Sequence, residues 1–201
     1  MAKIKYTKSE LKRQRDALKR FTRYLPTLEL KKQQLQAEIN RVRAARDRVA
    51  EREAQLRADL RSWAAVFGED AGIERLVRLA RVETAAGNIA GVDIPVFIRA
   101  DVSVEPYDLF AAPLWLDAGI ARMRDILSAT AERRILERQE QLLAEELRTT
   151  MQRVNLFDKV KIPEASDNIR VIQIVLGDEQ TAGVVRGKIA KQLLQRKAAP
   201  A

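Results

Sequence analysis

Apolar residues recur along the first third of the chain in two columns, each repeating every seven residues. One column is apolar at seven of its eight positions, Gln14, Phe21, Leu28, Leu35, Val42, Val49, Leu56 and Trp63. The other is apolar at five of eight, Leu11, Leu18, Leu25, Lys32, Ile39, Arg46, Glu53 and Leu60. Because the columns alternate in steps of three and four residues, residues 1–64 are predicted to form one arm of a left-handed coiled coil. An ordinary bundle helix is the alternative, but such helices rarely exceed about 25 residues.

The start of this arm carries a helix-capping signal. Thr7 is followed three residues later by Glu10, which is the spacing of a capping box. From there to Trp63 the sequence has no glycine and a single proline, Pro26. The helix should therefore begin close to Thr7 and continue to the end of the arm.

Residues 120–201 are predicted to form a second, less regular helical arm. Leu136, Leu143, Leu147 and Val154 continue a spacing of three and four residues. Pro163 is expected to interrupt this arm, and a last helical stretch should follow it.

The region between the arms, residues 65–119, has a different sequence pattern, which is typical of strands and a turn. Residues 81–86 and 92–98 read as short strands, and residues 87–91 form a glycine-bounded turn. These features predict a β-hairpin over about residues 80–98, in which Pro95 fits an edge strand. An isolated hairpin is marginally stable, so it should lean on the helices or on a partner.

The simplest architecture is all-α, with two long antiparallel helices and the small hairpin insert at their far tip. If Trp63 meets Ile126, then Pro26 lies opposite Pro163 and the two prolines share a bend. The same register leaves the last residues, about 19 of them, overhanging as a single helix.

The amino-acid composition excludes several kinds of catalytic and metal-binding site. The chain has 201 residues, 37 Lys and Arg against 28 Asp and Glu, and neither Cys nor His. The absence of Cys excludes disulfides and thiolate metal sites, and the absence of His excludes His-based triads and zincins. Residues 87–91 lack the Gly-Lys-Ser/Thr ending of a phosphate loop. We therefore expect no catalytic residues, no cofactor and no metal.

Charge is unevenly distributed. Residues 1–64 carry 18 basic and 8 acidic residues, residues 65–119 carry 4 and 9, and residues 120–201 carry 15 and 11. The basic arms leave a nucleic-acid-binding helical protein open as an alternative, although the cations are spread around the helix and few aromatic residues are available for base stacking. A solvated coiled coil explains the same charges, and a structural or adaptor coiled coil is a second alternative.

No stretch is long and apolar enough for a membrane span, and the N-terminus lacks a signal-peptide core. The protein is expected to be soluble and cytoplasmic, without direct membrane insertion.

Near the C-terminus, small residues share one helix face. Gly183, Gly187 and Ala190 follow one another at helical spacing, which would let another surface approach closely. The alternative is that the helix ends or frays near Gly177.

Four passages together resemble the D subunit of the V/A-type rotary ATPases, the central-stalk shaft. They are LPTLELKKQQLQ at 25–36, NIAGVDIP at 88–95, RVNLF at 153–157 with the Ile-Pro pair at 162–163, and LGDEQTAGVVRGKIAK at 176–191. The family often has an acidic-basic run where this chain has Gln180, Thr181, Ala182 and Gly183.

The resemblance implies a non-catalytic rotor that transmits torque between an ATP-handling hexamer and a membrane ring that translocates ions. It implies three sets of partners: the catalytic and regulatory subunits of the hexamer, the small F subunit of the stalk, and a socket subunit above the ring. The complex would hold the chain peripherally on the membrane. The predicted hexamer interface is Gly183, Arg186, Gly187, Lys188, Ala190, Lys191, Arg196 and Lys197, and the predicted hairpin contact is Asn88, Ile89, Gly91, Val92, Ile94 and Pro95.

Overall fold

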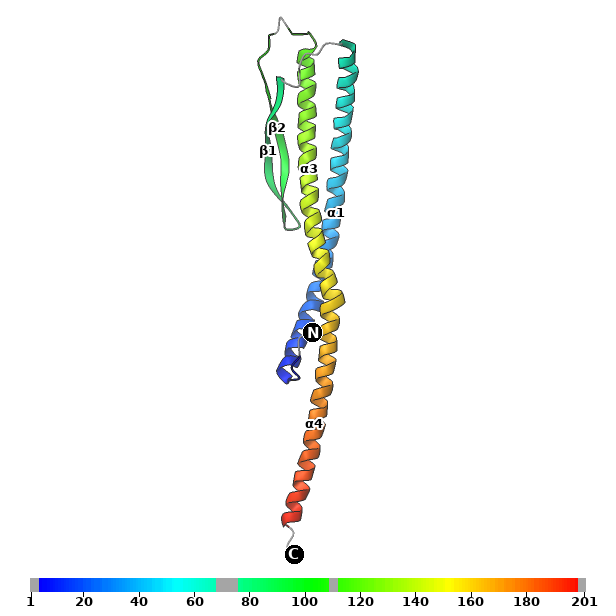
Figure 1. The fold of residues 1–201 in the computed structure, drawn as a ribbon, viewed down its shortest axis with the longest axis vertical. Coiled ribbons are helices and arrows are strands. Elements are labelled where there is room, and N and C mark those ends of the chain that lie inside the picture. Colours follow the sequence, from blue (N-terminus) through cyan, green and yellow to red (C-terminus); the bar gives the residue numbers. More distant parts are fainter. Residues whose placement is uncertain (1–3, 68–75, 109–111, 199–201) are drawn as a thin grey trace. The chain divides into compact units, whose positions relative to one another are not determined.

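The computed structural model describes residues 4–67, 76–108 and 112–198. Its elements are α1 (Lys8–Phe67), β1 (Val77–Ile89), β2 (Val92–Val104), α3 (Leu116–Leu156), a π-helical turn η1 (Phe157–Lys161) and α4 (Ile162–Ala198) (Figure 1). They fall into two units, a central unit of Lys31–Thr149 and a terminal unit of Met1–Leu30 with Thr150–Ala201. The helical architecture with a two-stranded antiparallel hairpin confirms the predicted fold class.

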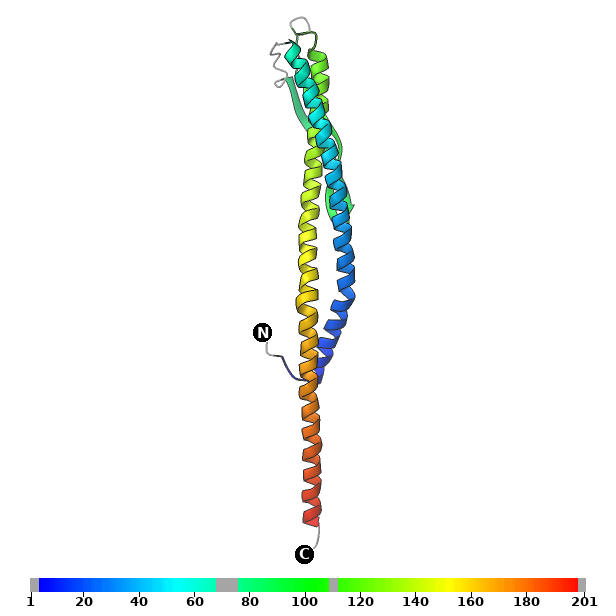
Figure 2. The ribbon, with the colours of Figure 1, turned by 90° about the vertical axis from the view of Figure 1, so that its right-hand side faces the viewer.

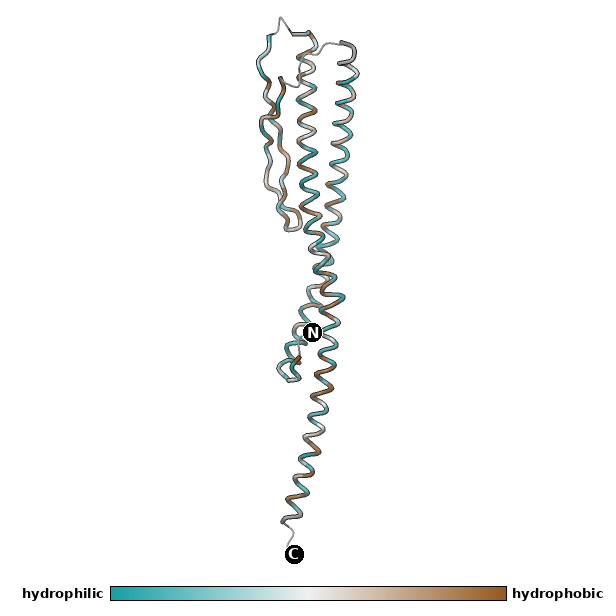
Figure 3. The backbone as a smooth tube through the Cα atoms, viewed as in Figure 1, coloured by the Kyte–Doolittle hydropathy of each residue, from teal (hydrophilic) through white to brown (hydrophobic). Residues whose placement is uncertain are grey.

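Helix α1 begins where the capping signal predicts. The backbone N–H of Glu10 donates to the Thr7 side-chain oxygen at 3.2 Å, which satisfies one of the free donors of the first turn. Along the helix, every described side chain of the two heptad columns is buried or half-buried. Figure 3 shows the resulting alternation of apolar and polar positions along the helices. Trp63 lies in α1, but its side chain is outside the described residues.

Within the central unit, α1 and α3 run antiparallel. Lys31 pairs with Glu146 at 2.6 Å, Arg43 and Arg46 with Glu140 at 2.6 Å, and Arg52 with Glu132 at 2.6 Å. The partner's number falls as the α1 number rises, which defines the antiparallel direction. Each exposed pair contributes at most about 1 kcal/mol, so the apolar seam between the helices is the main source of stability.

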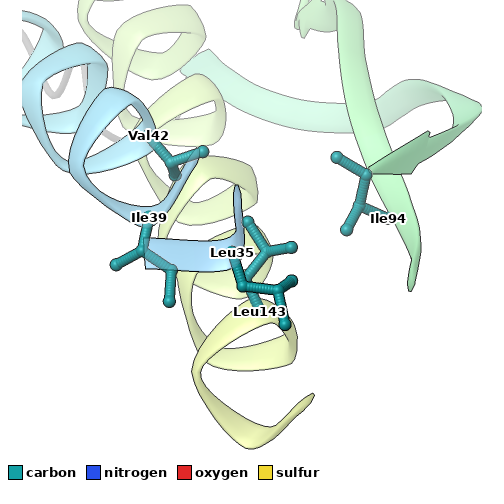
Figure 4. Close-up of a cluster of buried hydrophobic side chains, with 5 residues drawn as sticks. All are labelled: Leu35, Ile39, Val42, Ile94 and Leu143. Atoms are coloured by element: carbon teal, nitrogen blue, oxygen red, sulfur yellow. The ribbon is translucent and has the colours of Figure 1, made fainter. Parts of the chain in front are cut away.

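The core of the central unit joins three elements. Leu35, Ile39 and Val42 of α1 meet Leu143 of α3 and Ile94 of β2 in one buried cluster (Figure 4). Leu35 and Leu143 are both 0% exposed, and burying each side chain contributes roughly 1.5–3 kcal/mol. The hairpin therefore depends on the helix pair for its stability, as the sequence suggested.

The hairpin is longer than the expected span of residues 80–98, because each strand has 13 residues. Register shifts fall between Leu79 and Arg81 and between Glu83 and Thr84, where bulges let the ribbon twist. A second cluster anchors its open end, where Val77 packs against Leu116 and Ile120 of α3. From there the strands run back along α3 (Figures 1 and 2).

The hairpin turn is a two-residue loop. Ala90 has φ 52° and Gly91 has φ 80°, the positive values of a type I′ turn. Gly87 meets a different constraint, because a Cβ there would lie 2.7 Å from the Val96 Cγ2 atom across the ribbon. The cross-strand packing therefore leaves no space for a side chain at position 87.

One buried carboxylate lies in the α1–α3 seam. Glu53, 6% exposed, occupies a heptad-column position and accepts hydrogen bonds from Arg133 at 2.8 Å, Thr130 at 2.8 Å and Arg57 at 2.8 Å. Burial raises the pKa of Glu53, but the hydrogen bonds from Arg133, Thr130 and Arg57 outweigh burial and hold the pKa at about 2. A slip of the helices would bury this charge without its partners, so Glu53 fixes their register.

Glu53→Gln should lower the free energy of unfolding at pH 7 by about 2 kcal/mol, because Arg133 loses its anionic partner. The lowered pKa means that wild-type Glu53 stabilises the fold above pH 4.5 and loses this contribution as the pH falls toward 2. The gap between wild type and variant should therefore close over that interval in urea unfolding measured at several pH values. The exposed Glu51→Gln is the matched control, and a gap independent of pH would contradict the assignment.

In the terminal unit, the helix passes Pro163 without breaking, which corrects the expected interruption. Proline has no N–H to donate and its ring crowds the carbonyl four residues earlier. The chain responds with the π-turn η1, in which the N–H of Ile162 reaches the carbonyl oxygen of Phe157. The π-turn thus accommodates the proline and lets the helix continue.

The expected pairing of Pro26 with Pro163 is wrong. The rings of Phe21 and Phe157 lie 5.2 Å apart, so the helices of the terminal unit meet in a different register. Glu164, next to Pro163, lines the same pocket as Arg13, well before Pro26 in the sequence. Each proline is therefore accommodated separately, Pro26 within α1 and Pro163 by η1.

Thr150 is 1% exposed, and its Oγ1 atom has no hydrogen-bond partner among the described residues. An unpaired buried hydroxyl is costly, so Thr150→Val should raise the free energy of unfolding by about 1 kcal/mol in urea titrations. Thr149→Val is the control, since the Thr149 hydroxyl already donates to the Glu145 carbonyl at 3.1 Å. Equal or lower stability for the Thr150 variant would refute this explanation.

Candidate functional site

The C-terminal part of α4 is not covered by any other described part of the chain. The last buried residue is Ile172, and every residue from 177 to 195 is exposed. In Figures 1 and 2 this part extends past the start of α1. The helix continues through Gly177, so the alternative that it ends there is wrong.

This segment exposes large apolar side chains. The most exposed are Val184 at 60%, Val185 at 49%, Ile189 at 50%, Leu193 at 54% and Leu194 at 68%. Val185, Ile189 and Leu193 follow one another at four-residue spacing and so lie on one side of the helix. A solvent-exposed apolar stripe of this kind marks a surface that binds another protein.

The predicted interface residues lie in this same segment. Arg186, Lys188 and Lys191 are all exposed, and Arg186 Nε donates to the Ala182 carbonyl of its own helix at 3.2 Å. Arg196 and Lys197 are within the bounds of α4, but their side chains lie outside the described residues. The structure thus presents basic and apolar side chains together on one uncovered helix.

Gly183, Gly187 and Ala190 of α4 pack against no other described part of the chain. A Cβ added at Gly183 or Gly187 would meet nothing within 4 Å, and Ala190 is equally exposed. Each glycine costs roughly 1 kcal/mol in a helix relative to alanine. Packing within the described part of the chain therefore does not require these glycines.

The predicted hairpin residues divide into two groups. Ile89, Val92 and Ile94 pack against the core cluster of the helix pair, and the Pro95 carbonyl accepts a 2.6 Å hydrogen bond from Gln139 of α3. These four residues attach the hairpin to its own chain.

Asn88 and Gly91 remain exposed at the turn. The Asn88 side chain donates to Asp93 at 2.7 Å and accepts from the Gly91 N–H at 3.1 Å, so it shapes the turn. The hairpin also exposes Val96 at 40% and Ile98 at 57%, which the sequence analysis did not single out. The apolar run around Pro95 was the available signal for them.

Four of the 18 basic residues of the first arm have partners across the α1–α3 seam. Lys31, Arg43, Arg46 and Arg52 pair with carboxylates of α3. Among the described residues, no group of three or more carboxylates is placed to hold a metal ion. No described helix has an apolar segment long enough to cross a membrane. The candidate site consists of two surfaces, α4 beyond Gly177 and the outer residues of the hairpin.

Comparison with known proteins identifies the family. The sequence profile of the family described as the D subunit of ATP synthase matches residues 10–192. The chain belongs to this family. The D subunit of the V-type ATP synthase of Borreliella burgdorferi is 45% identical over 197 residues, covering 98% of both chains. The D subunit of the V-type ATP synthase of Chlamydia trachomatis serovar L2 is 35% identical over 205 residues. The D subunit of the V-type ATP synthase of Chlamydia caviae is 30% identical over 200 residues. Each of these alignments covers at least 96% of both chains.

The D-subunit profile covers both candidate surfaces. It includes the whole hairpin and the exposed helix as far as Gln192, and it stops before Arg196 and Lys197. The sequence of the uncovered part of α4 therefore lies, as far as Gln192, within the region that the D-subunit profile matches.

Proposed function

We propose that this chain is the non-catalytic central-stalk subunit of a V-type ATP synthase, and that it transmits torque between the ATP-handling hexamer and the ion-translocating ring. The observation that carries the proposal is the uncovered basic and apolar helix of residues 177–195 in a chain related to D subunits over nearly its whole length. In the assembly the chain would be held peripherally on the cytoplasmic side of the membrane.

The helix pair of the central unit suits a shaft. Two helices joined by a buried seam resist twisting better than one, and the ion pairs of Arg46 with Glu140 and Arg133 with Glu53 cross that seam. The buried Glu53 opposes sliding of one helix along the other, because sliding would leave its charge unpaired. These features support mechanical rigidity.

The exposed helix supplies the contact with the hexamer in this proposal. Its apolar stripe would bury surface against the catalytic and regulatory subunits, Gly183 and Gly187 would allow the closest approach, and the basic side chains would face acidic groups. The F subunit and the socket subunit would bind elsewhere on the chain, with the outer residues of the hairpin as one contact.

Reversing the charges of Lys188 and Lys191 to glutamate should lower the coupling between ATP hydrolysis and rotation. Rotation per ATP would be measured on single assembled complexes. The matched control reverses Arg48 and Arg61, which are also exposed but lie in α1. Unchanged coupling in the Lys188/Lys191 variant would exclude these cations from the hexamer contact.

A test of the proposed hairpin contact needs a variant that leaves the buried core intact. Val96→Thr with Ile98→Thr removes exposed apolar surface, whereas Ile94 remains in the buried cluster. We expect this double variant to weaken association with the stalk and socket subunits in co-purification, without changing the urea midpoint of the isolated chain. Thr84→Ser, on the neighbouring strand, is the control. Normal association of the double variant would remove the hairpin from the interface.

A tagged chain should co-purify with an ATPase head and a small stalk protein. Recovery as a stable homodimer without ATPase activity would favour the adaptor alternative instead.

A further inference from the structure

A pocket of about 300 Å³ lies between α1 and the start of α4, within the terminal unit. Its polar lining consists of three cations, one carboxylate and two amides, which are Arg13, Arg20, Lys161, Glu164, Gln14 and Asn168. Nothing in the proposed shaft function uses this pocket. Its volume is sufficient for a small polyatomic anion with bound water.

The cations of the pocket are unequally neutralised. Lys161 Nζ lies 2.9 Å from Glu164, and Arg13 lies 3.2 Å from Glu10. Arg20 has no ion-pair or hydrogen-bond partner among the described residues. The pocket therefore contains one cation whose charge is unopposed, beside two cations whose partners are exposed or shared.

The walls of the pocket also include apolar side chains. Phe21 lines it and packs against Phe157, and Ala165, 3% exposed, forms part of the opposite wall. Arg20 is itself exposed, so its attraction to an anion is partly screened by solvent and is strongest at low ionic strength. The π-turn places Lys161, its last residue, on the same pocket.

We propose that this pocket binds a phosphate group, either as inorganic phosphate or as the terminal phosphate of a nucleotide. The forked guanidinium of Arg20 can donate two hydrogen bonds to adjacent phosphate oxygens, and Lys161 can meet a third oxygen as a point charge. The Asn168 amide is a further donor in the lining, and the Gln14 amide, which already donates one hydrogen to Glu10 at 2.8 Å, has a second hydrogen to offer.

A compact phosphate fits this arrangement better than an acidic protein segment does. Glu10 and Glu164 lie directly beside the cations. An extended acidic segment would bring further carboxylates against these two residues and be repelled. A phosphate, by contrast, concentrates its charge in one place and can contact the cations alone.

Calorimetric titration of the full-length chain at low ionic strength tests the proposal, with inorganic phosphate and magnesium-free ATP as probes and chloride at matched ionic strength as the blank. We expect saturable one-site binding that Arg20→Gln weakens about tenfold, because a charge-assisted hydrogen-bond donor is lost. Arg23→Gln, an exposed arginine outside the pocket, should leave the affinity unchanged. Lys161→Gln should weaken binding to a smaller extent, and circular dichroism would verify that each variant is folded.

The two probes identify the source of the phosphate. Saturable binding of inorganic phosphate supports a free-phosphate site, and binding of ATP alone supports a nucleotide site. Equal loss of affinity in the Arg20 and Arg23 variants would overturn the proposal, because it would show general polyelectrolyte attraction. Heats no larger than those with chloride, or tighter Arg20-dependent binding of a hexaglutamate peptide, would overturn it as well.

Discussion

The structure depends on the seam between α1 and α3, where apolar columns repeating every seven residues are buried around one charged residue. Leu35, Ile39 and Leu143 supply nonspecific burial, which many registers of the two helices could satisfy. Glu53 restricts the choice, because its carboxylate is buried and needs both Thr130 and Arg133. Stability thus comes mainly from the apolar residues, and the register from a single ionic group.

This seam also determines which surfaces of the chain remain available to bind other proteins. The ion pairs between α1 and α3 use four of the 18 basic residues of the first arm, Lys31, Arg43, Arg46 and Arg52. The hairpin uses Ile94 and the Pro95 carbonyl to attach to the helix pair. After these contacts, the described part of the chain still presents an uncovered helix beyond Gly177, and that helix lies almost entirely within the region shared with D-subunit proteins. An exposed apolar helix face of this kind is typical of a component of a larger assembly.

Much of the fold could be predicted from periodicity alone. The heptad columns of α1 and the capping residue Thr7 were sufficient to locate the helix, because helix periodicity and capping are local signals. The register was not predictable from apolar residues, since shifting the helices preserves apolar contact. The polar position of Glu53 within a column was the informative signal, and its partners became evident only in three dimensions.

The other differences between the predicted and the observed structure also arise from contacts that local sequence patterns do not show. The π-turn at Phe157 depends on how the backbone accommodates Pro163, and local propensity treats such a proline as an interruption. The hairpin extends beyond its predicted ends because Val77 and Val104 belong to a cluster with Leu116, a contact between residues distant in sequence. The predicted interface residues Arg186 and Lys188 lie on a helix, as expected. The exposure of Val184 and Leu194 beside them could not be predicted, because it depends on which parts of the chain cover the helix.

In the proposed function, this chain rotates as a shaft inside a V-type ATP synthase. The sequence has no cysteine, so Arg48→Cys would introduce a single, exposed attachment point for a bead. In complexes immobilised by the hexamer, ATP should drive the bead around in one direction, in steps that follow hydrolysis. A bead that stays still while the same complexes hydrolyse ATP would contradict the account.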